Sequence, residues 1–310
     1  MAAPMVTPLD AGAAAAAYNA THTRLAVADL AGRLSLWQRT EGSAGGWTLA
    51  SSLPAEGLRI TSLCWAPKEF GGVLAGGASD GSVAVWQEAP GDGAWRLAAV
   101  LKEGALGVQD LAFAPPELGP LVAAAYADGA VRFFEASAVL AADSWELQNY
   151  FRLGRAAGAA TALSWRQPAP GLPPLLVVGT AAAGAQVWAY RRQLMRWEQE
   201  ATLGGPTEAG GRSVADVAWA PTLGRPYDIV AVAAGPAVTL WRVMGAADSL
   251  EVEQLTRLQH AAEVWQVEWN LLGSWLAAST DAGDVCLWRP DLGGEWLLLN
   301  RVVGEQQAAA

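Results

Sequence analysis

Aromatic residues recur along this chain in two series that keep step with each other. Each member of the first series closes a short run of alternating apolar residues, and each member of the second closes another run further on. Neighbours within either series lie 47 to 54 residues apart. The first series is Tyr18, Trp65, Phe113, Trp165, Trp219 and Trp269, and the second is Trp37, Trp86, Phe134, Trp188, Trp241 and Trp288. Two series in step indicate a repeated structural unit.

The last repeat shows how one unit is built. Apolar residues alternate along 264–269, and two further apolar runs follow at 275–278 and 284–288, with turn residues between them. This pattern predicts consecutive antiparallel strands. A period of about 50 residues with four strands is typical of propeller blades of the WD or kelch kind, and not of helical repeats. We therefore expect an all-β, six-bladed WD-repeat β-propeller.

The repeats fill most of the chain. A length of 310 residues alone would suggest about two domains, but six units that close around a common axis form one domain. We expect a short segment at 1–12, blades at 13–52, 58–101, 106–151, 158–203, 212–256 and 262–303, and a frayed end at 304–310.

Two turns share a sequence signature just before the third strand of their blades. Asp80-Gly81 and Asp128-Gly129 stand six and five residues before a second-series aromatic. Aspartate can bond its own turn backbone, and glycine accepts a positive φ, so these pairs predict tight hairpin turns.

Tryptophan is abundant, with 16 residues. A third, weaker series marks the outer strands at Trp47, Trp95, Trp145, Trp197 and Trp296. The three series contain fourteen of the 16 tryptophans and leave out Trp265 and Trp275. Surface tryptophans can bind carbohydrate or methyl-lysine, but the regular repeat favours a role in the core.

Charge and cysteine content restrict the partners and the compartment. The net charge of -10 disfavours direct binding of nucleic acid and of anionic membranes. Cys64 and Cys286 are too far apart to suggest a disulfide framework or a metal site, so inert thiols in a reducing compartment are expected. The N-terminus has neither a basic segment nor a long apolar core, and prolines and glycines interrupt the uncharged stretch 167–190. We expect no signal peptide and no membrane insertion.

Candidate catalytic residues are few. Ser279, His260 and Asp281 are the residue types of a Ser-His-Asp catalytic triad, but no nucleophile elbow surrounds the serine. His260, Thr280 and Asp281 match positions that brace many WD blades. No phosphate-binding loop or metal-spaced ligand pair is present, so we expect no enzyme, no cofactor and no metal site.

The strand count indicates how the ring closes. All six units already hold four consecutive strands, and the remaining N-terminal segment contains Pro4 and Pro8, which make it a poor strand. The propeller is therefore expected to be open, that is, not latched by its own termini, and to need a partner that covers its exposed edges and apolar flanks. The partner-binding candidates on the innermost strands are Ala15, Ala17, Tyr18, Val264, Trp265 and Val267. Ordinary packing of these strands in a closed ring is the alternative.

Several segments resemble one family. They are Trp65-Ala66-Pro67-Lys68-Glu69-Phe70-Gly71, Phe113-Ala114-Pro115, Trp219-Ala220-Pro221-Thr222 and 264–269. Together they resemble the Seh-type nucleoporins, whose near relative is the Sec-type vesicle-coat propeller, over nearly the whole chain. The exit of unit three at Phe134-Glu135-Ala136, and the absence of an Asp-Gly turn before the third strand of unit five, favour the nucleoporin.

The resemblance implies a non-enzymatic scaffold subunit of the nuclear pore complex at the nuclear envelope. In this family a helical scaffold nucleoporin inserts a blade in trans between blades one and six of an open six-bladed propeller. Other partners would be nucleoporins of the Y-shaped complex, and the role would lie in pore assembly and in protein and mRNA transport. In some lineages the same propeller also serves an amino-acid-signalling complex at the vacuolar or lysosomal membrane.

Two other readings stay open at this point. One is a vesicle-coat propeller, which differs in the helical scaffold that it recruits. The other is a propeller hydrolase with its site in the central funnel, which would require polar or metal-binding residues at the inner strand mouths. The inner strands supply mostly Ala, Val, Leu and Trp there.

Overall fold

The computed structural model describes residues 12–40, 46–89, 91, 93–104, 106–137, 145–168, 172–182, 184–205, 211–222, 224–245 and 249–303. Nearly all of segment 1–12 and the whole of 304–310 lie outside the described residues. The chain divides into two compact units, residues 1–150 and 151–310. Each holds three sheets of four strands, and each sheet is one blade.

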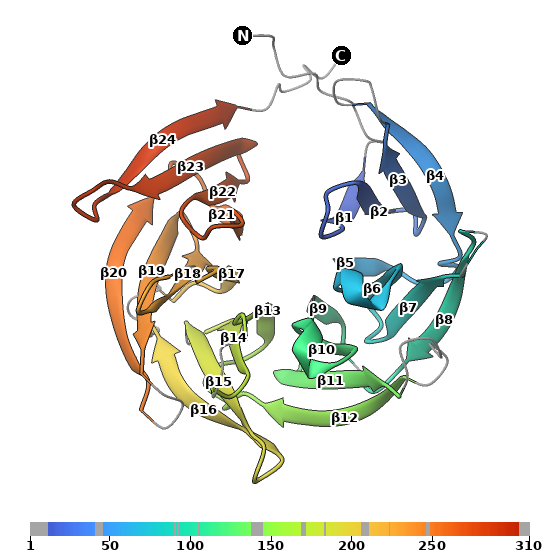
Figure 1. Ribbon diagram of the computed structural model, residues 1–310, viewed down its shortest axis with the longest axis horizontal. Coiled ribbons are helices and arrows are strands. Elements are labelled where there is room, and N and C mark those ends of the chain that lie inside the picture. Colours follow the sequence, from blue (N-terminus) through green and yellow to red (C-terminus); the bar gives the residue numbers. More distant parts are fainter. Residues whose placement is uncertain are drawn as a thin grey trace. The chain divides into compact units, whose positions relative to one another are not determined.

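In unit 1 the strands of each blade lie side by side in chain order (Figure 1). Blade 1 consists of β1 (Ala13–Tyr18), β2 (Arg24–Asp29), β3 (Leu34–Arg39) and β4 (Trp47–Leu53). Blade 2 consists of β5 (Ile60–Trp65), β6 (Val73–Ala78), β7 (Val83–Glu88) and β8 (Trp95–Leu101), and blade 3 of β9 (Val108–Phe113), β10 (Leu121–Tyr126), β11 (Ala130–Ala136) and β12 (Trp145–Arg152), whose last two residues belong to unit 2. Two 3-10 turns, η1 (Lys68–Phe70) and η2 (Pro116–Leu118), follow the inner strands of blades 2 and 3.

Unit 2 repeats the same plan (Figure 1). Blade 4 consists of β13 (Ala160–Trp165), β14 (Leu175–Thr180), β15 (Ala185–Arg191) and β16 (Arg196–Leu203). Blade 5 consists of β17 (Val214–Trp219), β18 (Asp228–Ala234), β19 (Ala237–Met244) and β20 (Glu251–Gln259), and blade 6 of β21 (Val264–Trp269), β22 (Leu276–Thr280), β23 (Asp284–Pro290) and β24 (Trp296–Val303). The predicted fold class is confirmed: the chain is an all-β, six-bladed β-propeller.

The two main aromatic series mark fixed places in every blade. Each member of the first series ends an inner strand, as Trp65 ends β5 and Trp269 ends β21. Members of the second series lie on the third strand. In blades 1, 2, 4, 5 and 6 the register between third and outer strands shifts directly before this aromatic. A bulge bends the strand and increases its twist, so the repeated aromatic marks the place where each of these five blades bends.

The Asp-Gly turn between β6 and β7 has the predicted geometry. The Asp80 carboxylate accepts hydrogen bonds from the Ser82 backbone N–H at 3.0 Å and from the Ser82 hydroxyl at 2.5 Å. These bonds lower the pKa of Asp80 to about 2. Gly81 has φ 85°, and a Cβ there would lie 2.5 Å from the Gly104 carbonyl oxygen, so only glycine fits.

Candidate partner-binding site

Neighbouring blades pack through apolar faces, which we call flanks. The front flank of a blade faces the next blade along the chain, and the back flank faces the preceding one. In unit 2, Leu240 and Leu258 on the front flank of blade 5 pack with Leu276 and Trp269 on the back flank of blade 6. All four side chains are buried. A flank is therefore a side-chain surface that a further sheet must cover.

Hydrogen bonds join the inner ends of adjacent blades. The Trp269 indole donates to the Ala218 carbonyl of blade 5 at 3.0 Å, and in unit 1 the Trp65 indole donates to the Ala17 carbonyl of blade 1 at 2.8 Å. The Val267 N–H also donates to the Asp216 carboxylate of blade 5 at 2.7 Å. The first aromatic series thus ties each of these inner strands to the blade before it.

The front flank of blade 6 lacks such cover. In blade 5 the strand register pairs Ala231 with Leu240 and Val238 with Leu258, and all four are buried. The same register in blade 6 pairs Ala277 with Leu287 and Val285 with Val302, and none of these four is buried. Val302 is 48 % exposed.

Other blades confirm that Val302 is the exception. The outer-strand residue at its place is Leu53 in blade 1, Leu203 in blade 4 and Leu258 in blade 5, which are buried, and Leu101 in blade 2, which is half-buried. The second strand shows the same contrast, because every residue of β14 and β18 is buried, whereas β22 alternates between buried and half-buried residues. Blade 6 therefore carries a flank of the usual composition that the described residues leave open to solvent.

The back flank of blade 1 is also open to solvent. Ala13 and Ala16 on β1 are exposed, and Tyr18 is 51 % exposed, although the equivalent Trp269 is buried. Trp37 is half-buried, whereas its counterpart Trp86 in blade 2 is fully buried. The first and last blades of the chain thus each present one uncovered flank.

The six candidate residues divide into two groups. Ala15 packs against the core that blades 1 and 2 share, and Ala17 offers its carbonyl to Trp65 of blade 2. Val264 and Val267 are buried in the core that blades 5 and 6 share. The other two, Tyr18 and Trp265, are exposed, and Trp265 is 56 % exposed. A partner role for the six residues stays a prediction, and the exposure favours Tyr18 and Trp265.

Sequence reasoning missed most of the blade 6 flank. It named residues of β21, whereas the open surface extends over β22, β23 and β24. A usable signal was present, because Trp265 and Trp275 are the two tryptophans outside the three series, and both are substantially exposed. A tryptophan that breaks the repeat has no core position to fill.

His260 braces blade 6 as a WD-type histidine would. Its Nε2 accepts a hydrogen bond from the Trp288 indole at 3.1 Å, and the rings meet edge to face with centroids 5.5 Å apart. Burial lowers the pKa of His260, which favours the neutral ring that this bond requires. Its Nδ1 and the Thr280 hydroxyl are buried without a partner among the described residues. The Nε2 atom of His260 thus binds the indole of Trp288, and not a nucleophilic side chain.

The cysteines fit the expectation of inert thiols. Neither forms a disulfide, and burial raises the pKa of the Cys64 thiol and of the Cys286 thiol. A thiol with a raised pKa is a poor nucleophile at neutral pH.

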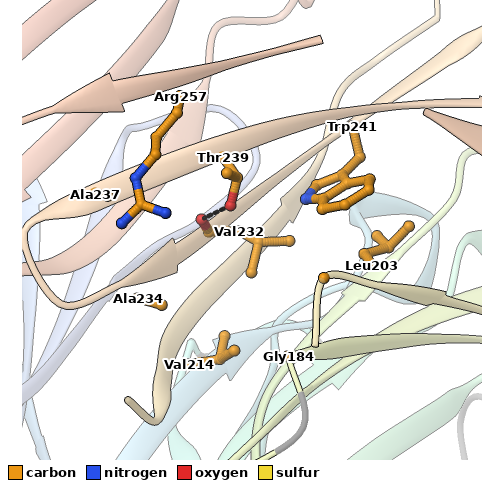
Figure 2. A pocket seen from close by; sticks show the side chains of 10 residues that line it. Gly184, Leu203, Val214, Val232, Ala234, Ala237, Thr239, Trp241 and Arg257 are labelled. Atoms are coloured by element: carbon orange, nitrogen blue, oxygen red, sulfur yellow. Dashed lines mark hydrogen bonds between the residues drawn. The ribbon is translucent and has the colours of Figure 1, made fainter. Parts of the chain in front are cut away.

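Two hollows of the described surface are too small for a substrate. Figure 2 shows one in unit 2, where Val232, Thr239 and Trp241 lie around a space of about 20 Å³ and the Thr239 hydroxyl donates to the Val232 carbonyl at 3.3 Å. Another, in unit 1 beside Phe70 and Trp145, measures about 10 Å³. Such spaces admit about one water molecule.

The described residues hold neither a cluster of metal ligands nor a membrane-spanning helix. Among them, no group of three or more His, Cys, Asp or Glu side chains is placed to hold a metal ion. Within the same part of the chain, no helix has the length and apolar character to span a bilayer.

Comparison with known proteins agrees with this architecture. The model of the WD domain, G-beta repeat, matches residues 252–289. Protein SEH1 of Arabidopsis thaliana is 32 % identical over 319 aligned positions, covering 96 % of this chain and 97 % of the relative. Nucleoporin SEH1 of Homo sapiens is 29 % identical, covering 85 % of this chain and 77 % of the relative, and Nucleoporin SEH1-A of Xenopus laevis is 27 % identical, covering 88 % and 80 %. On the identity and coverage of the plant relative, with six blades and a WD repeat, the chain belongs to the SEH1 family of WD-repeat nucleoporins.

Proposed function

We propose that this chain is a structural, non-enzymatic subunit of the nuclear pore scaffold that works by accepting a blade from a partner. The site of action is the nuclear pore complex in the nuclear envelope, in keeping with relatives named nucleoporins. The partner is a helical scaffold nucleoporin, as the family resemblance implies. Its inserted blade packs between blades one and six, on the front flank of blade 6 and the back flank of blade 1.

One observation carries this proposal. Val285, Leu287 and Val302 occupy places where blade 5 has fully or almost fully buried residues, yet they are accessible to solvent. Adjoining apolar side chains that stay exposed in this way are typical of an interaction site. Each apolar Å² that a partner removes from water contributes about 25 cal/mol. A sheet that covers both flanks therefore gains binding free energy from the same apolar contacts that hold neighbouring blades together.

The geometry favours packing of faces over pairing of edges. Each sheet already has four strands, and the unusual exposure of blades 1 and 6 lies on their flanks. Sheets that pack face to face interdigitate side chains at a separation of about 10 Å. A permanent interface of this kind is expected to bury about 2,000 Å² or more.

The test compares two valines of equal exposure on outer strands. Val302 lies on the front flank of blade 6 and is 48 % exposed, whereas Val100 on β8 is 49 % exposed and lies on neither open flank. Tagged wild-type, Val302→Glu and Val100→Glu chains are recovered from native lysate at moderate salt, and partners present at a one-to-one ratio are identified by mass spectrometry.

We expect wild type and Val100→Glu to retain helical scaffold nucleoporins, and Val302→Glu to lose them while its melting temperature stays close to that of wild type. Retention of the partner by Val302→Glu would show that the blade 6 flank is not part of the interface. Recovery of vesicle-coat or amino-acid-signalling subunits in place of nucleoporins would overturn the pore assignment. A wild-type chain that stays alone and monomeric would overturn partner binding itself.

A further inference from the structure

The turn between β21 and β22 in blade 6, residues 270–275, is held firmly by one asparagine. The Asn270 side-chain oxygen accepts hydrogen bonds from the backbone N–H groups of Ser274 at 2.8 Å and Trp275 at 3.0 Å. The Asn270 N–H donates to the Trp275 carbonyl at 3.0 Å, and the Gly273 N–H donates to the Asn270 carbonyl at 2.9 Å. These bonds close the turn from both sides.

Blade 5 fixes the turn from outside. The Arg225 guanidinium donates to the Gly273 carbonyl at 2.9 Å and to the Pro221 carbonyl at 2.8 Å. Gly273 has φ 60°, and a Cβ on it would lie 2.1 Å from the Pro221 carbonyl oxygen. The turn is thus anchored to the neighbouring blade and loses little conformational entropy on binding.

This rigid turn presents apolar side chains to solvent. Leu271 is 81 % exposed and Leu272 is 60 % exposed. Leu292, in the turn between β23 and β24 at the same end of the sheet, is fully exposed. We call Leu271 and Leu272 the leucine pair.

Blade 1 builds the same turn without leucine. The Asn19 side-chain oxygen accepts from the N–H groups of Thr23 at 2.9 Å and Arg24 at 3.0 Å, as Asn270 does in blade 6. His22 has φ 53° at the place of Gly273. The residues at the positions of the leucine pair are Ala20 and Thr21. The turn therefore forms without leucines, and folding of this turn gives no reason for them.

We propose that the leucine pair is a second docking point, which inserts into an apolar groove on a helical segment of the same partner that covers the front flank of blade 6. This inference rests on the proposed function. The leucine pair is continuous with the open flank of blade 6, because Trp275 ends the turn and begins that flank. Its place in blade 5 is taken by Ile229, which is buried against blade 6. A partner that covers the flank therefore reaches the leucine pair without a break.

The surroundings of the turn define the chemistry of the groove. Glu268, Asp291 and Glu295 are exposed near the two turns beside one exposed arginine, Arg289, and the whole chain has a net charge of -10. An anionic bilayer is disfavoured by this charge. A helical groove edged by lysine or arginine complements both the leucines and the carboxylates.

The experiment places a photoreactive phenylalanine analogue at one of three positions in the full-length chain inside cells. Position 302 reports the flank, position 271 reports the leucine pair, and position 20 is the matched control in the blade 1 turn. Cross-linked peptides are identified by mass spectrometry after irradiation. We expect positions 302 and 271 to label one protein, with position 271 labelling a helical segment outside the inserted strands, and position 20 to stay unlabelled by that segment.

A double variant measures the contribution to binding. Leu271→Ala with Leu272→Thr gives blade 6 the residues of blade 1, so its melting temperature should match wild type. Because full burial of one leucine is worth about ten-fold or more in affinity, we expect partner dissociation to become at least about ten-fold faster.

The outcomes separate the two proposals. Labelling from position 302 without labelling from position 271 above the level of position 20 would overturn the leucine-pair proposal and leave the flank intact. Labelling of a lipid, a second copy or an unrelated protein from position 271 would overturn the assigned occupant. Absence of labelling from position 302 would overturn the proposed function.

Discussion

Blades 5 and 6 are neighbours with the same strand plan, yet they meet their surroundings differently. Blade 5 buries Ala231, Val238 and Leu240 on its front flank, because blade 6 covers them. Blade 6 has Ala277, Val285 and Leu287 at the same positions and leaves them accessible. The residues are of the same kind in both blades, so the difference lies in what covers them. An apolar flank is therefore either core or binding surface according to its place in the chain.

The largest expected effect separates the two flanks directly. Leu240→Ala removes a fully buried side chain and should lower the free energy of unfolding by about 2–5 kcal/mol. Leu287→Ala, at the same register in the half-buried flank, should cost less than about 1 kcal/mol in the isolated chain. Urea denaturation of both variants checks this. Equal losses would mean that the blade 6 flank is already covered within the chain.

A smaller effect is expected from the inner strands. Asp216 of blade 5 bonds the Val267 N–H of blade 6, while Gln266 holds the same strand position in blade 6 and is exposed. Asp216→Ala leaves that N–H without its carboxylate and should cost about 1–3 kcal/mol. Gln266→Ala should change the urea midpoint by no more than experimental error. A measurable loss from Gln266→Ala would show that the open side of β21 also carries a structural contact.

The fold could be predicted from the sequence because the largest side chains, the aromatic ones, recur at a regular spacing. The aromatics that end the inner strands also make the contacts between blades, as Trp65 and Trp269 do through their indole N–H groups. Because each of these aromatics both ends an inner strand and contacts the neighbouring blade, it occurs at the same place in the repeat. The spacing between them therefore gives the length of one blade. The alanine-rich strand β1 formed as expected, although alanine has weak strand propensity.

The binding surface was harder to predict, because strand alternation does not say which neighbour covers each face. Ala15, Val264 and Val267 were chosen for their place on the terminal inner strands, but their side chains pack on the neighbouring blade within their own unit. Leu287 and Val302 have the composition of ordinary core residues, so only the three-dimensional structure shows them uncovered. The two tryptophans outside the series were the one local clue.

Acidification should weaken the covered side of blade 6. Burial lowers the pKa of His260 below its usual value of 6.5, so the folded state favours the neutral ring and the unfolded state takes up the proton first. The stabilisation is complete above pH 6.5 and decreases as the pH falls below that value, by at most about 1.4 kcal/mol per pH unit for one proton. Urea midpoints at pH 7.5 and 5.5 measure it.

The control for this titration is His260→Gln, which removes the ionisable ring and keeps a side chain that can accept from the Trp288 indole. It should lose less stability than wild type between the two pH values. The carboxylates with lowered pKa, such as Asp80, stay ionised over this range and do not contribute. An equal loss in the variant would assign the pH dependence to another group.

The smallest effect concerns the two asparagine-held turns. Blade 6 uses Gly273 at φ 60°, whereas blade 1 places His22 at φ 53°, where a side chain costs about 1–2 kcal/mol. His22→Gly removes this cost but adds the backbone entropy of glycine and loses the ring contact with Tyr18, whose centroid is 5.7 Å away. We expect a net gain of about 0.5 kcal/mol in unfolding free energy. Ala20→Gly in the same turn, where φ is not positive, should lower stability by a similar amount. If His22→Gly destabilises the chain as Ala20→Gly does, the ring contact with Tyr18 outweighs the strain. His22 would then help to position Tyr18 on the open flank of blade 1.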